Sequence, residues 1–70
     1  MLKRHLDLAE RHVLDGQEHI ARQREIVAQL EHRHRESTTL KIACELLMEM
    51  EDAQRLHMAD RDGLRALLLP

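Results

Sequence analysis

The chain has 70 residues, of which 43% are hydrophobic and 34% charged, and it contains no Phe, Tyr or Trp. Eleven basic residues stand against 13 acidic ones, so the formal net charge is -2. A chain this short, without large side chains, cannot enclose a deep pocket and also keep a packed core. We therefore expect one small domain over residues 1–70 that is not an enzyme, with no catalytic residues and no cofactor.

The composition also narrows the fold class and the cellular compartment. Leu, Ala, Glu, Arg, Gln and Met make up most of the chain, and all six are good helix formers, whereas Gly occurs twice and Pro once. No uncharged run approaches the ~18 residues of a membrane span, and the first residues lead into charged sequence rather than an apolar signal core. We expect an all-α protein in the cytoplasm, without membrane contact.

An apolar repeat with alternating spacings of four and three residues runs through the first half of the chain. Its members are Leu2, Leu6, Ala9, Val13, Gly16, Ile20, Gln23, Val27 and Leu30. A similar repeat in the second half contains Ala43, Leu46, Met50, Ala53, His57, Asp60, Leu64 and Leu67. Such spacing is typical of helices that pack along one seam. It predicts one helix over about residues 2–35 and another over about 38–68.

The two repeats do not share a phase, so one continuous helix would lose its apolar seam halfway along. The break is predicted at Glu36-Ser37-Thr38, because Ser and Thr are natural helix N-caps. If the chain turns over residues 36–38, the seams align with Leu6 opposite Leu67 and with Gly16 opposite His57. The sequence therefore predicts an antiparallel helical hairpin.

Polar residues interrupt both predicted seams. We interpret them as a buried polar layer that sets the register of the helices, formed by Gly16, Gln23, His57 and Asp60. The alternative is a metal or small-ligand site in the middle of the bundle, whose candidate residues are His12, Asp15, His19, His57 and Asp60. No two histidines are four residues apart, the close spacing that structural zinc sites use, so we assign no metal.

A lone hairpin would leave apolar residues beside the seam in water. On the second helix these flanking residues are Leu40, Ile42, Leu47, Leu56 and Leu68, which we predict to form an interface. Two hairpins packed together as a four-helix bundle would bury both surfaces, so we expect a homo-oligomer, with a dimer favoured. An unknown protein partner is the other way to cover this surface.

Two stretches resemble a known group of proteins. The segments His5-Leu-Asp-Leu-Ala-Glu-Arg-His-Val13 and Leu56-His-Met-Ala-Asp-Arg-Asp62, with Gly16 between them, are similar to short uncharacterised helical-hairpin proteins of alpha-proteobacteria. The resemblance covers most of residues 2–68 and implies a helical hairpin in a bacterial cytosol, without an activity.

Composition and the predicted hairpin together indicate which partners and which function to expect. Because acidic residues outnumber basic ones and no aromatic ring can stack on a base, we expect no nucleic-acid partner. We predict a non-enzymatic, self-associating helical-hairpin module for interaction or regulation. The alternative function is a metal- or small-ligand-binding bundle that uses the histidine and aspartate residues named above.

Overall fold

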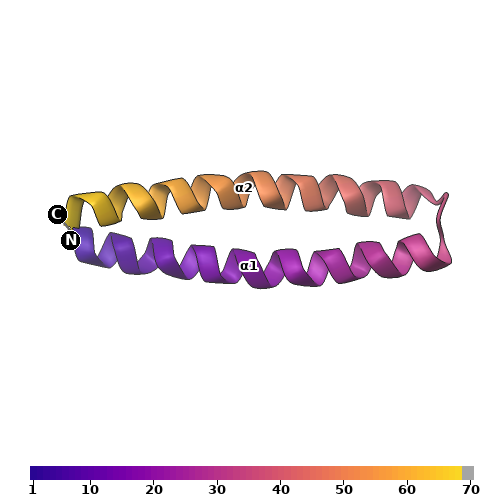
Figure 1. The fold of residues 1–70 in the computed structure, drawn as a ribbon, viewed down its shortest axis with the longest axis horizontal. Helices are drawn as coiled ribbons and strands as arrows, with labels where there is room; N and C mark the ends of the chain where they lie inside the picture. The colour runs from indigo at the N-terminus through magenta and orange to yellow at the C-terminus, as the bar shows by residue number, and fades with distance from the viewer. Residues whose placement is uncertain (69–70) are drawn as a thin grey trace.

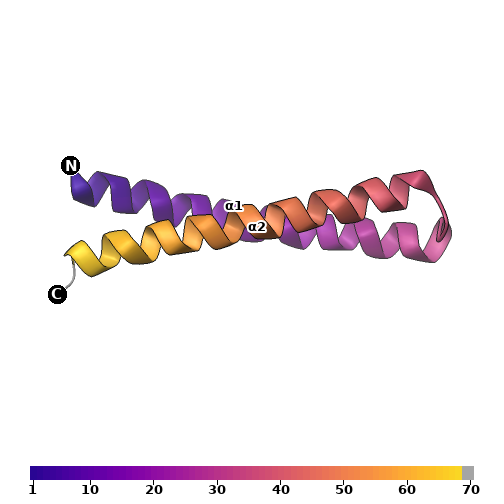
Figure 2. The ribbon, with the colours of Figure 1, turned by 90° about the horizontal axis from the view of Figure 1, so that it is seen from above.

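The computed structural model describes residues 1–68 and contains two long helices, α1 (Leu2–Arg33) and α2 (Thr38–Leu68). The helices run antiparallel, with the start of α1 beside the end of α2 and the connection at the far end (Figure 1). The hairpin is 50 Å long and 16 by 15 Å across. Seen from above, the helices cross at a shallow angle near their middles (Figure 2). The predicted all-α fold with two helices is confirmed, and residues 69–70 of the expected domain lie outside the described residues.

The connection between the helices is short and is organised by Ser37. The last backbone bond of α1 joins the amide of His34 to the carbonyl of Leu30 at 2.6 Å, so α1 ends two residues before the predicted position 35. The Ser37 hydroxyl accepts a hydrogen bond from the Leu40 amide at 3.1 Å and donates one to the His34 carbonyl at 2.9 Å. Ser37 is thus the N-cap of α2 and also links this helix to the end of α1.

The seam of α1 follows the predicted repeat from Leu6 onward, whereas Leu2, the first predicted member, is exposed. Its buried residues are Leu6, Ala9, Val13, Ile20, Gln23 and Val27. Val13 is the most enclosed of these, with 1% of its surface exposed. The spacing of four and three residues therefore places one continuous stripe of α1 against α2.

The seam of α2 differs from the prediction at every second position. The buried and half-buried residues are Leu40, Ala43, Leu47, Met50, Gln54, His57, Arg61, Leu64 and Leu68, together with Cys44 and Glu51 beside them. The predicted members at positions 46, 53, 60 and 67 are exposed instead. Of the five predicted interface residues, Leu40, Leu47 and Leu68 therefore belong to the seam within the hairpin, whereas Ile42 and Leu56 are exposed.

The register differs from the prediction by three residues, because Gly16 lies against Gln54 and not against His57. Hydrophobicity does not separate the two seams, since each offers a leucine at positions 46 or 47 and at 67 or 68. The two stripes differ in the length of their polar side chains. Gln54 reaches the Val13 carbonyl across the seam through its Nε2 atom, and Arg61 is 18% exposed while its guanidinium pairs with Asp62 of the same helix. A long side chain can bury its stem and still carry a polar group to a partner, which the shorter side chain of Asp60 cannot do from a buried position.

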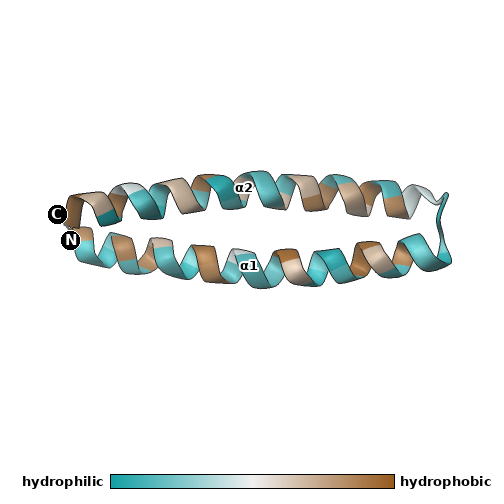
Figure 3. Ribbon diagram, viewed as in Figure 1, coloured by the Kyte–Doolittle hydropathy of each residue, from teal (hydrophilic) through white to brown (hydrophobic). Residues whose placement is uncertain are grey.

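The distribution of apolar residues extends beyond the seam. Figure 3 shows brown apolar positions that recur along the whole length of both helices, between teal polar ones. Neither α1 nor α2, over the described residues, carries an apolar stretch that could cross a lipid bilayer. Apolar side chains outside the seam therefore lie among charged ones, on helix faces that the hairpin itself does not cover.

Candidate functional site

The two long sides of the hairpin that flank the seam have different chemistry. On one side, which we call the charged face, Arg24 pairs with Glu51 at 3.1 Å and Arg65 lies 3.4 Å from Glu10. These pairs join the two helices but are largely exposed, and such pairs contribute about 0–1 kcal/mol each. On the charged face, Arg24 and Arg65 thus have their partners within the same chain.

The opposite side, which we call the histidine face, carries the polar groups that the sequence singled out. Three open hollows of about 210, 280 and 120 Å³ follow one another along it. The first is lined by His5, Leu8, Ala9, His12, Asp60 and Leu64. The second is lined by His12, Asp15, Gly16, His19 and His57. The third is lined by Gly16, His19, Ile20, Met50, Ala53, Gln54 and His57.

Two of these histidines come from different helices and lie side by side. The ring centroids of His12 and His57 are 5.5 Å apart, and the ring planes are inclined at 42°. His12 is exposed, whereas His57 is half-buried and its Nδ1 atom is enclosed without a hydrogen-bond partner. The Nε2 atom is therefore the nitrogen through which the imidazole of His57 can meet a ligand from outside.

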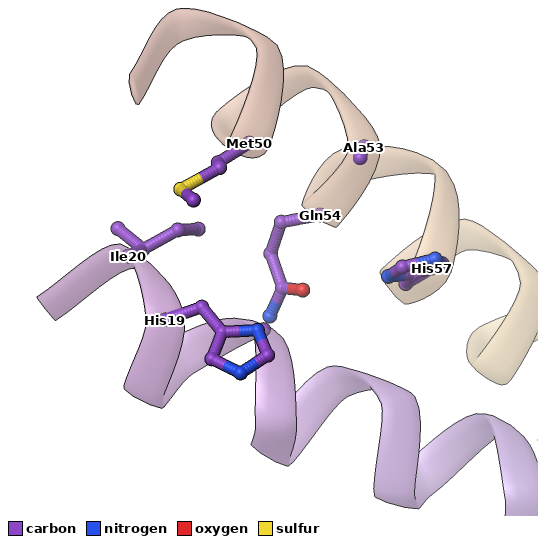
Figure 4. A pocket seen from close by; sticks show the side chains of 7 residues that line it. His19, Ile20, Met50, Ala53, Gln54 and His57 are labelled. Carbon is purple, nitrogen blue, oxygen red and sulfur yellow. The ribbon is translucent and has the colours of Figure 1, made fainter. Parts of the chain in front are cut away.

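Gln54 occupies the middle of the seam beside these rings. Its side chain is buried, with 7% exposed, and its Nε2 atom donates a hydrogen bond to the carbonyl of Val13 at 2.8 Å. Its Oε1 atom is enclosed and has no partner. Figure 4 shows the amide of Gln54 between the helices, with its oxygen turned toward the side of His57. Gln54 thus offers one unused acceptor at the base of the histidine face.

Gly16 makes room for this amide. A Cβ atom added to Gly16 would lie 2.0 Å from Oε1 of Gln54 and 2.8 Å from its amide carbon, well inside van der Waals contact. Any other residue at position 16 would push the amide away from α1. Gly16 thus accommodates a large side chain of α2, but that side chain is Gln54 and not the predicted His57.

A second glutamine makes the reciprocal contact from α1. Gln23 is buried, and its Nε2 atom donates to the carbonyl of Ala43 at 2.9 Å. A helical carbonyl already accepts one bond from the amide four residues later, and its second lone pair is free for such a side chain. Each helix therefore contributes one glutamine that binds the backbone of the other helix.

The predicted polar layer is only partly the one that the structure contains. Gly16 and His57 are half-buried at the seam and Gln23 is buried in it, but Asp60 is exposed. Gln54 belongs to the layer and was missed. The signal for it was the row of positions 40, 47, 54, 61 and 68, which repeats every seven residues and begins and ends with Leu.

The candidate metal residues lie near one another without forming a complete site. His12, Asp15, His19 and His57 line one hollow, and Asp60 lines the neighbouring one. Within residues 1–68, however, no three His, Cys, Asp or Glu side chains converge closely enough to hold a metal ion. A single hairpin therefore presents pairs of ligands at most.

Comparison of the chain with models of protein families, with curated proteins and with solved structures found no match. The function is therefore argued from the geometry of the hairpin.

Proposed function

We propose that this chain is a non-enzymatic, self-associating helical hairpin, in which the histidine faces of two copies pack together as a four-helix bundle and serve as an interaction module. The observation that carries the proposal is the imbalance between the small core and the large exposed apolar surface of one hairpin.

The core of one hairpin is small. Over residues 1–68 the buried apolar side chains are Leu6, Ala9, Val13, Ile20, Val27 and Ala43. Two of these six are alanines, and the other buried residues of the described chain are glutamines. Chains of about 70 residues bury too little apolar surface for high stability unless they associate or carry staples. Association would supply the missing burial.

The exposed apolar side chains of α2 form a second stripe beside the seam. We call Ile42, Leu46, Ala53, Leu56 and Leu67 the outer row. They belong to a row with spacings of three and four residues, which Glu49, Asp60 and Gly63 interrupt, so they share one side of the helix. Ala53 lines a hollow with His19, which places this side on the histidine face. Leu56 and Leu67 are 72% and 69% exposed, and each would contribute about 1.5–3 kcal/mol if fully buried.

The chemistry favours a second copy of the chain as the partner that covers the outer row. The row on α1 that flanks the same face carries Leu8, which lines a hollow with His5 and His12, and Ile26, which follows His19 by seven residues. Leu8 and Ile26 are 52% and 40% exposed. When two hairpins lie side by side with their connections at the same end, α1 of one packs antiparallel on α2 of the other. The outer row of one copy then meets Leu8, Ile26 and the imidazole rings of the other, so one contact covers the apolar rows of both helices.

The test is the association state of metal-free protein. Sedimentation equilibrium in EDTA at micromolar chain concentration should show a dimer. The variant Leu56→Lys should weaken the dimer at least tenfold, because a charge would enter the middle of the interface. Leu14→Lys is the matched control: Leu14 is 61% exposed but is not a member of the apolar rows on the histidine face, so its substitution should leave the association unchanged.

Two results would contradict the proposal. A wild-type chain that stays monomeric at high micromolar concentration in EDTA would remove self-association. A dimer that is weakened equally by Leu56→Lys and by Leu14→Lys would place the interface elsewhere than on the histidine face.

A further inference from the structure

We infer that His12 and His57 form half of a transition-metal site, of the kind that binds Zn²⁺, which is completed by the same two residues of a second hairpin. The inference rests on the proposed function, because the second pair of ligands comes from the dimer described above. It adds a metal ion that links the two copies, and it specifies that His12 and His57 of one copy lie beside the same residues of the other.

The spacing of the two rings fits a shared metal ion. A Zn–N bond is about 2.0–2.1 Å, and the ring centre lies about 1.1 Å beyond the nitrogen, so each centroid lies ~3.2 Å from the ion. Two such rings at a tetrahedral angle have centroids ~5.2 Å apart. The observed separation between His12 and His57 is 5.5 Å, and the planes are tilted rather than stacked. The separation of the two ring centroids is thus close to that of two rings bound to one metal ion.

One hairpin cannot complete the coordination. No group of three His, Cys, Asp or Glu side chains within residues 1–68 can hold a metal ion, whereas tetrahedral zinc takes four ligands. The proposed packing of two copies implies a twofold axis parallel to the long axis of the hairpin. This axis places each residue of one histidine face at the same height along the bundle as the same residue of the other copy. The pair on one copy then meets the same pair on the other, and two pairs make four nitrogen ligands.

Two enclosed atoms without hydrogen-bond partners support this assignment, namely Nδ1 of His57 and Oε1 of Gln54. Because Nδ1 of His57 is enclosed, Nε2 is the nitrogen that faces the ion, and the neutral ring then carries its proton on Nδ1. A ligand histidine ordinarily donates that proton to an outer acceptor, which fixes the ring. Oε1 of Gln54 is an enclosed acceptor without a partner, on the side toward His57 (Figure 4). The two atoms are not hydrogen-bonded to each other in the single hairpin; Gln54 is assigned as the positioning residue to which Nδ1 would donate once the ring holds zinc.

The experiment measures zinc binding and association together. Protein stripped with EDTA and dialysed is titrated with Zn²⁺ alone, by calorimetry and by sedimentation equilibrium. We expect one zinc ion for each two chains and at least a tenfold decrease in the dimer dissociation constant. Substitution with Co²⁺ should give the intense visible absorption of a tetrahedral ion.

Variants at exposed and half-buried positions separate the ligands from general effects. His12→Ala alters an exposed side chain and should abolish the effect of zinc without altering the hairpin. His57→Ala should also abolish the effect of zinc, and because His57 is half-buried in the seam its urea unfolding is compared with that of the wild type. His32→Ala removes an exposed histidine near the other end of α1 and is the matched control, which should bind zinc like the wild type. Gln54→Met should weaken zinc binding by about 10–100-fold, as is usual for outer partners of ligand histidines.

The outcomes distinguish this inference from the proposed function. Two results overturn the metal site and leave self-association intact. The first is a dimer in EDTA that binds no zinc at micromolar concentration. The second is zinc binding by His12→Ala and His57→Ala that is as tight as that of the wild type. One zinc ion bound by each monomer without any change in association also overturns the shared site. A chain that is monomeric in EDTA and dimeric with zinc supports the site, while it removes the proposal of metal-free association.

Discussion

The side-chain amide of Gln54 lies directly on Gly16, where a single added carbon would come within 2.0 Å of its oxygen. This contact sets the register of the hairpin, because it joins the only glycine in the seam of α1 to a polar side chain that needs room in the seam of α2. From the same position Gln54 donates to the carbonyl of Val13. Three properties of the fold thus depend on Gly16 and Gln54: the register of the two helices, the hydrogen bond from Gln54 to the Val13 carbonyl and the unused acceptor beside His57.

The two glycines of the chain provide a direct measure of this contact. Gly63 lies in α2 with nothing near its added Cβ, so Gly63→Ala should stabilise the protein by about 0.5–1 kcal/mol through helix propensity alone. Gly16→Ala gains the same propensity but must displace the amide and break its hydrogen bond to Val13, which costs about 1 kcal/mol. The free energy of unfolding from urea titration, at one chain concentration, should therefore rise for Gly63→Ala and stay level or fall for Gly16→Ala. Equal stabilisation by both variants would show that the amide does not hold the register.

Replacement of Gln54 by Met tests what the buried amide contributes to stability. Met has the same length, so it fills the space over Gly16 and removes the enclosed Oε1 atom that has no partner. The carbonyl of Val13 keeps its helical hydrogen bond, so no new unpaired group is left behind. We expect Gln54→Met to be as stable as the wild type or more stable by up to about 1 kcal/mol. A loss of stability well above 1 kcal/mol in thermal and urea unfolding would instead make the bond to Val13 a main support of the hairpin.

The connection between the helices depends on the Ser37 hydroxyl. Ser37→Ala removes the acceptor for the Leu40 amide and the donor to the His34 carbonyl, and loss of an N-cap costs about 1 kcal/mol. Thr39→Ala, at an exposed position two residues later, is the control and should change the stability by less than about 0.5 kcal/mol. The comparison uses urea unfolding curves recorded side by side. If both variants unfold at the same denaturant concentration, Ser37 does not cap α2 in solution.

Much of the fold followed from local pattern. The composition and the repeat in residues 2–30 predicted two helices and the buried stripe of α1, and the Ser and Thr residues at 37–39 predicted where the chain turns. These features depend on helix propensity, on the period of 3.6 residues and on capping, all of which act between residues close in the chain. Their prediction needs no knowledge of the partner helix.

The seam of α2 could not be predicted in the same way, because two stripes of this helix carry nearly equal apolar residues. The packed hairpin covers the stripe with the longer polar side chains: Nε2 of Gln54 donates across the seam to the Val13 carbonyl and Arg61 pairs with Asp62 of its own helix, whereas Asp60 is too short to reach a partner from a buried position. The register and the approach of His12 to His57 follow from that choice. The sequence by itself determined the helices and the turn. Only tertiary packing decided which stripe of α2 is covered and which remains open, since that depends on which polar side chains reach a partner when they are buried.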